Sequence, residues 1–396
     1  MARSSGRDGC MTQVQTLAGK EIVIGVTGSI AAVEVVKLIH ELRRKGAGVQ
    51  VVMSRAATGI IHPDAFTYAS ARPVITRLSG MVEHVGYCGD NGTADLLLIA
   101  PCTANTIGKI ATGIDDTPVT TFAATALGSG IPVLVVPAMH HSMYRHPAVM
   151  ENLKRLKGWG ISIVGPRIEE EKAKIAAVGE IVLWTERLVL GHPLKGRRVL
   201  ITSGPCREPV DDVRVLTTRS SGQMGRELAL HAFRLGADVT VVHRDIFPCV
   251  NNIFAETGEE MYNQVTGCIS KSGVEIYISA AAISDFAPIK VKGKVPSGRA
   301  CSIDLIPLPK LLDEVISNFK PVTVAFKLGW DSERMARDLL KRGAVMVVCN
   351  TPDTMGSKEG VFVLRTKDRS ETIDGSKEAA AIAIWNSLLA LQQKNS

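Results

Sequence analysis

Short apolar runs alternate along the chain with longer segments in which apolar residues recur every three or four positions. The short runs, rich in Val, Ile and Leu, predict buried strands, and the periodic segments predict amphipathic helices. In the first half the predicted strands are 21–26, 49–53, 95–100 and 132–137, and the predicted helices are 31–45, 64–70, 104–111, 117–126 and 147–157. In the second half the predicted strands are 198–202, 238–242, 275–280, 323–327 and 344–348, and the predicted helices are 222–235, 309–318 and 332–342.

This alternation of strands and helices indicates parallel sheets covered by helices. We therefore expect an α/β fold made of two open, doubly wound, mostly parallel-sheet (Rossmann-like) domains in tandem, with ligands beyond the carboxyl ends of the strands. Two similar openings mark the domains, Leu17-Ala18-Gly19-Lys20 and Leu194-Lys195-Gly196-Arg197. We predict a mobile tail over residues 1–19, a first domain over 20–190 and a second over 191–396.

The composition fits a globular protein, with 45% hydrophobic and 21% charged residues in 396. No apolar run approaches the roughly 20 residues that span a bilayer, and residues 1–19 lack the apolar segment of a signal peptide. The eight cysteines are scattered, so zinc and redox motifs are excluded. The net charge of +7 is spread out, which favours small anionic substrates over nucleic acid, while most of these charges are expected simply to form a solvated surface. We expect a cytoplasmic protein with neither a membrane nor a nucleic-acid partner.

A glycine-bearing turn, Gly25-Val26-Thr27-Gly28-Ser29-Ile30-Ala31, follows the first predicted strand. Glycines at such a turn let an anionic ligand approach backbone N–H groups, and the start of a helix favours negative charge. The glycine spacing differs from the dinucleotide fingerprint, and the acidic residue expected about 20 positions later for an NAD ribose is missing. Ser54 follows the second strand instead, and its hydroxyl suits a phosphate.

Two further loops follow apolar strands, Ala-Pro-Cys-Thr-Ala-Asn-Thr at 100–106 and Val-Pro-Ala-Met-His at 136–140. With the glycine turn and Glu83-His84-Val85, they resemble the homo-oligomeric flavin-containing cysteine decarboxylase family over about residues 18–185. The resemblance implies FMN, with its phosphate at Gly28–Ile30 and the 103–105 loop and its isoalloxazine ring near Pro101 and Ala138–Met139. The predicted FMN-binding residues are Gly28, Ser29, Ile30, Ser54, Pro101, Thr103, Ala104, Asn105, Ala138 and Met139.

The same resemblance implies that His84 is the catalytic base. Oxidative decarboxylation of a C-terminal cysteine begins with removal of a thiol proton and transfer of hydride to the flavin. An imidazole titrates near neutral pH and suits the proton transfer, while the flavin supplies the redox capacity.

The first half departs from the family pattern at two places. Many members carry Asn after Pro-Ala-Met to hold the substrate carboxylate, and this chain has His140. Bacterial relatives place an acid-donating Cys on a flexible flap, and the equivalent stretch here, residues 169–176, contains none. Lys172, Lys174 or His140 are the candidates for returning the proton, as in an archaeal-type variant. Cys102 lies in a different loop and is predicted to be a small buried apolar residue.

A second glycine turn, Ser220-Ser221-Gly222-Gln223-Met224-Gly225, opens the helix 222–235. Together with the segments 203–211, 280–286, 325–327 and 349–350, it resembles phosphopantothenate–cysteine ligase over residues 195–352. Joining a carboxylate to an amine in water requires acyl activation, which a nucleoside triphosphate with Mg²⁺ supplies. The resemblance implies CTP, with ATP as the alternative, and names no metal ligands. The predicted nucleotide-binding residues are Ser279, Ala280, Ala281, Asp285, Lys294, Pro309, Lys310, Leu311, Leu312, Phe326 and Arg342.

This half also departs from its family. Relatives carry Asn at the position of Thr218, where it acts on the acyl-cytidylate, and Lys at the position of Gln223. Weakened ligation is therefore an open alternative, with Arg219 or Lys327 as compensating groups. Lys290 and Lys292 are alternatives to Lys294 as the phosphate-binding lysine.

The order of the two halves matches the bifunctional proteins of coenzyme A biosynthesis. The resemblance implies ligation of cysteine to 4′-phosphopantothenate, followed by FMN-dependent decarboxylation of 4′-phosphopantothenoylcysteine to 4′-phosphopantetheine. It also implies a homo-oligomer, built from trimers around the flavin and extending to a dodecamer through paired ligase domains. The alternatives are a two-domain NAD(P)-dependent oxidoreductase, disfavoured by the glycine spacing, and a flavin-binding regulatory subunit, which would not need the second half.

Overall fold

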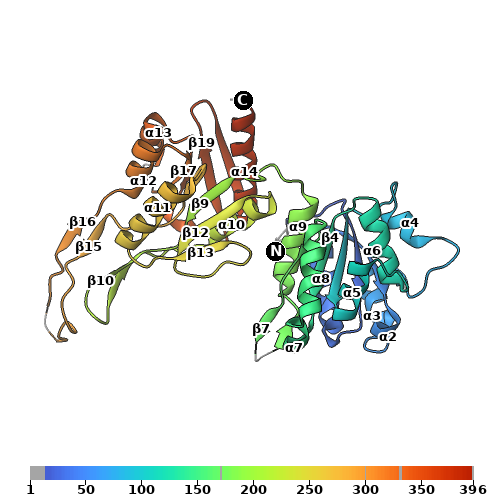
Figure 1. Cartoon of the computed structure of the whole chain (residues 1–396). Coiled ribbons are helices and arrows are strands. Elements are labelled where there is room, and N and C mark those ends of the chain that lie inside the picture. The colour runs from blue at the N-terminus through green and yellow to red at the C-terminus, as the bar shows by residue number, and fades with distance from the viewer. Residues whose placement is uncertain (1–13, 170–171, 299, 330–331, 395–396) are drawn as a thin grey trace, which may run out of the picture. The chain divides into compact units, whose positions relative to one another are not determined.

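The computed structural model describes residues 14–169, 172–298, 300–329 and 332–394. The chain divides into two compact units at Gly191 and His192 (Figure 1). Within the described ranges, no helix combines the length and the apolar character of a membrane span.

The first unit is built on a five-stranded parallel sheet. Its strands, in spatial order, are β2 (Gly48–Met53), β1 (Glu21–Val26), β3 (Leu96–Cys102), β4 (Val133–Pro137) and β6 (Ser162–Ile163). Side chains of β1 alternate between two apolar cores, with Ile22 and Ile24 in one and Val23 in the other. Both faces of the sheet are therefore buried, which explains why its strands are apolar at nearly every position.

Helices cover both faces of this sheet (Figure 1). They are α1 (Val35–Arg44), preceded by the 3₁₀ turn η1 (Ile30–Glu34), α2 (Arg55–Thr58), α3 (Pro63–Ser70), α4 (Glu83–Cys88), α5 (Ala104–Thr112), α6 (Pro118–Gly128), α7 (His141–Tyr144), α8 (Pro147–Gly158) and α9 (Val178–Val189). A separate three-stranded antiparallel sheet has the order β5 (Met139–His140), β8 (Lys172–Lys174) and β7 (Arg167–Glu169).

The segment just before β1 corrects one prediction. Leu17 is fully buried in the core that contains α1 and α9, and its N–H donates to the carbonyl of Lys45 over 2.7 Å. The hydroxyl of Thr16 donates to the carboxylate of Glu186. Residues 14–19 are thus packed onto the first unit, and the predicted mobile tail, 1–19, is wrong for this part. Residues 1–13 lie outside the described residues.

The second unit contains an eight-stranded sheet. Its strands, in spatial order, are β13 (Asn251–Phe254), β12 (Asp238–His243), β9 (Arg198–Thr202), β14 (Ile276–Ser279), β17 (Val322–Leu328), β18 (Met346–Asn350), β19 (Glu359–Arg365) and β20 (Ser370–Ser376). The first six pair in parallel, and β19 and β20 extend the sheet antiparallel. The prediction of two mostly parallel α/β folds in tandem is confirmed.

The other elements of this unit surround the sheet or project from it. The helices are α10 (Gln223–Arg234), α11 (Gly258–Ser272), α12 (Leu311–Glu314), which continues into the π turn η2 (Val315–Phe319), α13 (Ser332–Arg342), the short η3 (Pro352–Thr354) and α14 (Lys377–Lys394). Two antiparallel pairs complete it, β10 (Arg207–Pro209) with β11 (Val215–Thr217), and β15 (Phe286–Pro288) with β16 (Leu305–Pro307).

Helix α14 packs on α10 and was not predicted from the sequence. Ala380, Ala381, Ile384, Trp385 and Leu388 of α14 are buried. The indole N–H of Trp385 donates to the carbonyl of Leu228 in α10 over 2.9 Å. This contact joins segments far apart along the chain and closes the second unit.

We expect Trp385→Ala to lower the free energy of unfolding of the second unit by about 3–5 kcal/mol, because it empties a fully buried site. Urea unfolding followed by hydrogen exchange in peptides from each unit measures the effect. Trp159→Ala is the matched control, since Trp159 is 52% exposed, and should change stability by less than about 0.5 kcal/mol. Equal losses in the two variants would contradict the packing described.

Candidate functional site

Three loops of the first unit converge at the carboxyl edge of its sheet. They follow β1, β2 and β3, which are neighbours in the sheet, and β1 and β3 flank the point where the strand order reverses. Each loop ends in a side-chain cap: Ser29 accepts from Ala31 N–H, Ser54 from Ala57 N–H and Thr103 from Thr106 N–H. Open parallel sheets bind ligands in this crevice. The structure thus brings Gly28, Ser29, Ser54 and Thr103 to one edge.

The buried hydroxyl of Thr27 fixes the first and third loops to each other. It donates to the carbonyl of Pro101 over 2.7 Å and accepts from the N–H of Thr103 over 3.1 Å. Thr27 is 1% exposed, so these bonds form away from water. The peptide bond before Pro101 is cis. The later loop joins this frame because Ala138 N–H donates to the Cys102 carbonyl.

Gly28 lies where no side chain fits. A Cβ built at Gly28 would stand 2.6 Å from the Cβ of Ala56 in α2. The first loop therefore approaches the second without a side chain between them. Ile30 is 76% exposed, Asn105 is exposed, and Ala104 and Met139 are partly buried. This cradle suits the phosphate end of a flavin nucleotide.

His84 lies on the short helix α4, and its surroundings leave one ring nitrogen free. Its ring packs edge-to-face against Phe122 of α6, with 6.4 Å between the ring centroids. The Nδ1 atom is buried and, among the described residues, has no hydrogen-bond partner. A buried polar atom without a partner is costly unless a ligand or water satisfies it. The resemblance, and not the helix, identified His84, because the sequence analysis predicted no helix there.

The predicted flap forms the small sheet with the Pro-Ala-Met turn. In that sheet Met139 pairs with Ala173, and His140 pairs with Lys172. His140 is exposed, and its Nδ1 lies 2.8 Å from the hydroxyl of Ser142. Lys174 is partly buried, and the side chain of Lys172 lies outside the described residues. The structure thereby places the backbone of two candidate proton donors side by side.

Cys102 lies fully buried in β3, as predicted. Burial raises the pKa of its thiol far above the ordinary value, because a thiolate would lose its hydration there. A thiol held in this protonated form does not act as a nucleophile.

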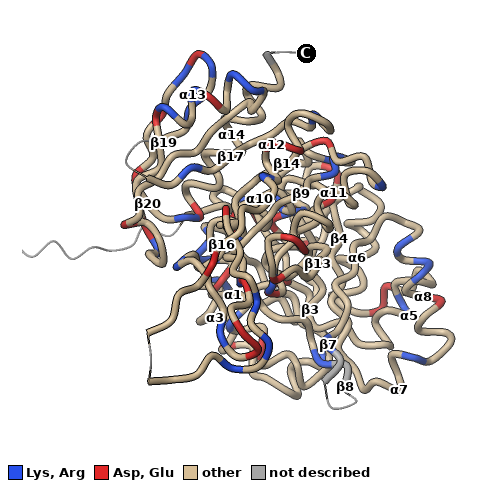
Figure 2. Tube along the Cα trace, turned by 90° about the vertical axis from the view of Figure 1, so that its left-hand side faces the viewer, with Lys and Arg blue, Asp and Glu red and all other residues tan. Residues whose placement is uncertain are grey.

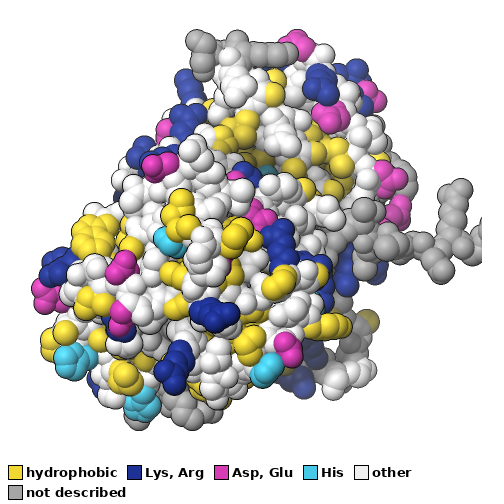
Figure 3. Space-filling model, turned by 90° about the vertical axis from the view of Figure 1, so that its right-hand side faces the viewer, with side chains coloured by type: hydrophobic (Ala, Val, Ile, Leu, Met, Phe, Trp, Pro, Cys, Tyr) yellow, Lys and Arg dark blue, Asp and Glu magenta, His cyan; other side chains and the backbone are white. Residues whose placement is uncertain are grey.

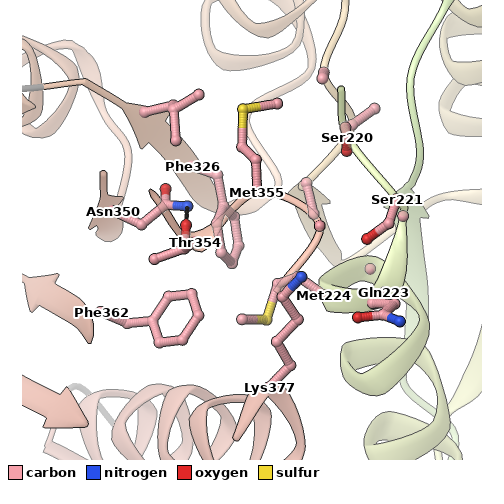
Figure 4. A pocket seen from close by; sticks show the side chains of 17 residues that line it. Ser220, Ser221, Gln223, Met224, Phe326, Asn350, Thr354, Met355, Phe362 and Lys377 are labelled. Atoms are coloured by element: carbon pink, nitrogen blue, oxygen red, sulfur yellow. Dashed lines mark hydrogen bonds between the residues drawn. The ribbon is translucent and has the colours of Figure 1, made fainter. Parts of the chain in front are cut away.

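A pocket of about 680 Å³ of empty space lies in the second unit, at the carboxyl edge of its sheet. Figure 4 shows its walls: the glycine turn before α10, the end of β17 with Phe326, and residues after β18 with Met355. Asn350 donates to the hydroxyl of Thr354 over 2.7 Å and fixes one wall. The lining residues are Ser220, Ser221, Gly222, Gln223, Met224, Gly225, Ala280, Ala281, Ala282, Phe326, Leu328, Asn350, Thr354, Met355, Gly356, Phe362 and Lys377.

Only part of the predicted nucleotide set lines this pocket. Ala280, Ala281 and Phe326 do, and Ser279 directly precedes them at the end of β14. Arg342 is instead paired with Asp313 of α12 at 2.8 Å. The same helix contains Leu311 and Leu312, and Pro309 and Lys310 directly precede it. Asp285 and Lys294 are exposed and are not among the lining residues. The pocket also contains residues that the prediction missed: Thr354, Met355, Phe362 and Lys377.

The segment between β15 and β16 is attached to the loop before β11. Asp211 accepts hydrogen bonds from the N–H groups of Val295, Val213 and Arg214. These hydrogen bonds, of which the one from Val295 has the largest effect, lower the pKa of Asp211 to about 2, and the charge of Arg214 adds a smaller effect. Lys290 pairs with Asp212 at 2.9 Å. Of the three lysines considered for phosphate, Lys290 is therefore engaged, whereas Lys292 and Lys294 are exposed.

Thr218 is partly buried in the loop that leads to the pocket, and its hydroxyl accepts from Ser220 N–H over 3.4 Å. Gln223, where relatives carry Lys, lies in the pocket wall. No cluster of three or more His, Cys, Asp or Glu side chains able to hold a metal ion occurs among the residues that the structure describes. Figure 2 shows Lys and Arg interspersed with Asp and Glu along the trace.

Comparisons with known proteins agree with this geometry. A family model described as Flavoprotein matches residues 11–190, and one described as DNA/pantothenate metabolism flavoprotein C-terminal domain matches residues 194–391. The coenzyme A biosynthesis bifunctional protein CoaBC of Thermococcus kodakarensis is 41% identical over 391 residues, covering 95% of this chain and 96% of the relative. CoaBC of Vibrio vulnificus is 35% identical over 355 residues, covering 85% and 87%.

A solved structure, the C-terminal domain of a CoaBC, is 28% identical and covers 51% of this chain and 99% of its own, with a TM-score of 0.43.

Two tandem parallel-sheet units, the first of the flavoprotein family, define a two-domain flavoprotein enzyme. The chain belongs to the family of coenzyme A biosynthesis bifunctional proteins, CoaBC, and it is a decarboxylase and a ligase.

We expect Gly28→Ala to weaken flavin binding by about tenfold to hundredfold, because overpacking at this contact costs roughly 1–3 kcal/mol. The flavin absorbance per protein, measured after dialysis of the purified enzyme, reports the loss. Gly128→Ala is the control, because a Cβ at Gly128 meets no atom within 4 Å. Full flavin content in Gly28→Ala would show that the first turn does not hold the cofactor.

Proposed function

We propose that the second unit ligates cysteine to 4′-phosphopantothenate and that the first unit decarboxylates the product on FMN. The observation that carries the decarboxylase half is the partner-free buried Nδ1 of His84 together with the Gly28 cradle. The ligase half rests on the pocket between the glycine turn and Phe326. We include a cytoplasmic location, because phosphorylated substrates do not cross membranes unaided.

In the first unit, we assign the flavin phosphate to Gly28, Ser29, Ile30, Ser54 and the N-terminal turn of α5 from Thr103 to Asn105. The isoalloxazine ring then lies near Pro101, Ala138 and Met139. Bound at these residues, FMN would supply the hydride-accepting and hydride-donating capacity that the decarboxylation needs. His84 takes the thiol proton of the cysteine end of the substrate, because a neutral imidazole nitrogen can accept it.

The proton that completes the product comes from His140, Lys172 or Lys174 in this proposal. Support comes from the pairing of His140 with Lys172 in the small sheet. Strand β8 pairs with β5, which contains Met139, so the backbone of the flap lies beside the Pro-Ala-Met turn. The flap thus supplies basic residues where bacterial relatives place a cysteine.

We further propose a homo-oligomer in which the flavin crevice lies between copies of a trimer, extending to a dodecamer. Ile30 at the crevice is 76% exposed, and Val82 and Val85 beside His84 are 46% and 48% exposed. Apolar side chains at both places suit burial against a second copy. Figure 3 shows hydrophobic side chains among polar groups on the face that it presents.

In the second unit, CTP with Mg²⁺ activates the carboxylate, with ATP as the weaker alternative. The proposed nucleotide contacts are Ser279–Ala281, Asp285, Lys294, the segment Pro309–Leu312, Phe326 and Arg342. Thr218 takes the place of the relatives' Asn beside the acyl nucleotide, and its hydroxyl can donate where an amide would. Cysteine then displaces the nucleoside monophosphate, so pyrophosphate and the monophosphate are the released products.

We expect His84→Asn to lower the decarboxylation rate at least a hundredfold and to leave ligation within twofold, since the base is lost only in the first unit. Mass spectrometry of 4′-phosphopantothenoylcysteine and 4′-phosphopantetheine separates the two steps. His62→Asn is the matched control, because exposed His62 caps α3 and Asn caps equally well. Equal loss of both activities in His84→Asn would refute this division of labour.

With 4′-phosphopantothenate, cysteine, Mg²⁺ and CTP, we expect the purified enzyme to form 4′-phosphopantothenoylcysteine together with CMP and pyrophosphate. ATP should support a slower reaction, and EDTA should stop it, because Mg²⁺ neutralises the polyphosphate. Mass spectrometry identifies the condensed product. Absence of product with either nucleotide would exclude ligation by the second unit, and faster turnover with ATP would exclude the CTP preference.

A further inference from the structure

Lys377, the first residue of α14, is the only charged one among the described residues that line the pocket between the glycine turn and Phe326. It is 8% exposed, and Figure 4 shows its side chain reaching from α14 toward Met224 and Gln223 of the α10 turn. Its backbone N–H donates to the Lys358 carbonyl. Among the described residues, its ammonium has no hydrogen-bond or ion-pair partner. Burial lowers the pKa of Lys377.

The surroundings of this ammonium are electropositive. The 12-residue helix α10 begins at the pocket, and its N-cap residue, Gly222, has no side chain that could accept hydrogen bonds from the first N–H groups of the helix. Within the described residues, the N–H groups of Gln223, Met224 and Gly225 donate to no acceptor. Lys377 itself stands at the N-terminus of an 18-residue helix, where a cation is disfavoured.

Among the residues that the structure describes, nothing in the pocket lining offsets this charge, because these lining residues include neither Asp nor Glu. A buried cation is stable only when it is paired and hydrogen-bonded. Three free amides, the Lys377 ammonium and the hydroxyls of Ser220 and Ser221 therefore surround a space that fits an anion with several acceptor oxygens.

We propose that Lys377 is a phosphate-binding residue of the second unit, where its ammonium acts together with the first turn of α10. A phosphoryl group fits because its tetrahedral oxygens can accept from the amides, the hydroxyls and the ammonium at once. This inference rests on the proposed ligation, in which both 4′-phosphopantothenate and the nucleoside triphosphate carry such a group. Lys377 is a binding residue for that group and takes no part in the chemical step.

The test is Lys377→Met in the full-length enzyme, with KM and kcat measured separately for 4′-phosphopantothenate, nucleoside triphosphate and cysteine. Met has a similar length, and replacing an unpaired buried charge by an apolar side chain should not lower the melting temperature. We expect the KM of one phosphorylated substrate to rise at least tenfold, with kcat within threefold and the KM of cysteine unchanged. The substrate affected identifies the source of the phosphate.

Lys358→Met is the matched control, because Lys358 is exposed and is not among the residues lining the pocket. Inorganic pyrophosphate serves as a probe that needs no turnover: it should raise the melting temperature of the second unit in the wild type and in Lys358→Met, but not in Lys377→Met. Lys377→Arg keeps the charge and should retain most of the rise in melting temperature with pyrophosphate. It replaces Lys377→Met if that variant does not fold. Loss of this rise in Lys377→Arg would then count against the subsite.

A Lys377→Met enzyme with both phosphate-substrate KM values within twofold of the wild type and full pyrophosphate protection would overturn the proposal. A change confined to the KM of cysteine would overturn it as well. If the wild type ligates nothing, the proposed function fails, whereas the pyrophosphate comparison still decides whether Lys377 binds phosphate.

Discussion

Parallel pairing of buried strands is the constraint on which both units depend. In a parallel sheet every strand delivers its following loop to the same edge, so loops from distant parts of the sequence meet there. Buried hydroxyl groups then fix the loops: Thr27 joins the loops after β1 and β3 in the first unit. In the second unit Ser203 donates to the Gly222 carbonyl, and Thr202 accepts from Ala281 N–H.

The sequence was most informative where burial imposes a simple pattern. Strand β3 is apolar throughout and β1 is apolar after Glu21, and α10 carries apolar residues at 224, 228 and 232, so their positions could be predicted closely. Helix α14 could not be recognised in this way, because its apolar residues are not confined to one face. The antiparallel hairpins have short, exposed strands such as β11, whose side chains carry no burial pattern.

The candidate site residues also differ in whether a local sequence pattern could predict them. Glycine turns were recognised from the sequence because Gly28, and Gly225 against Ser203, are required by close backbone approach. Lys377 gave no local signal: only the packing of α14 on α10 brings it to a pocket whose wall includes the distant glycine turn 220–225. His84 depended on resemblance, since its significance lies in a ring nitrogen left without a partner by packing against Phe122.

The contact between Trp385 and Leu228 has a consequence for folding during translation. These residues are 157 positions apart, and a ribosome adds roughly 5–20 residues per second. The apolar surface of α10 that α14 buries therefore stays exposed for on the order of ten to thirty seconds during translation. Throughout that interval the nascent second unit exposes this apolar surface, and α10 is then the segment to which chaperones that bind nascent chains can attach.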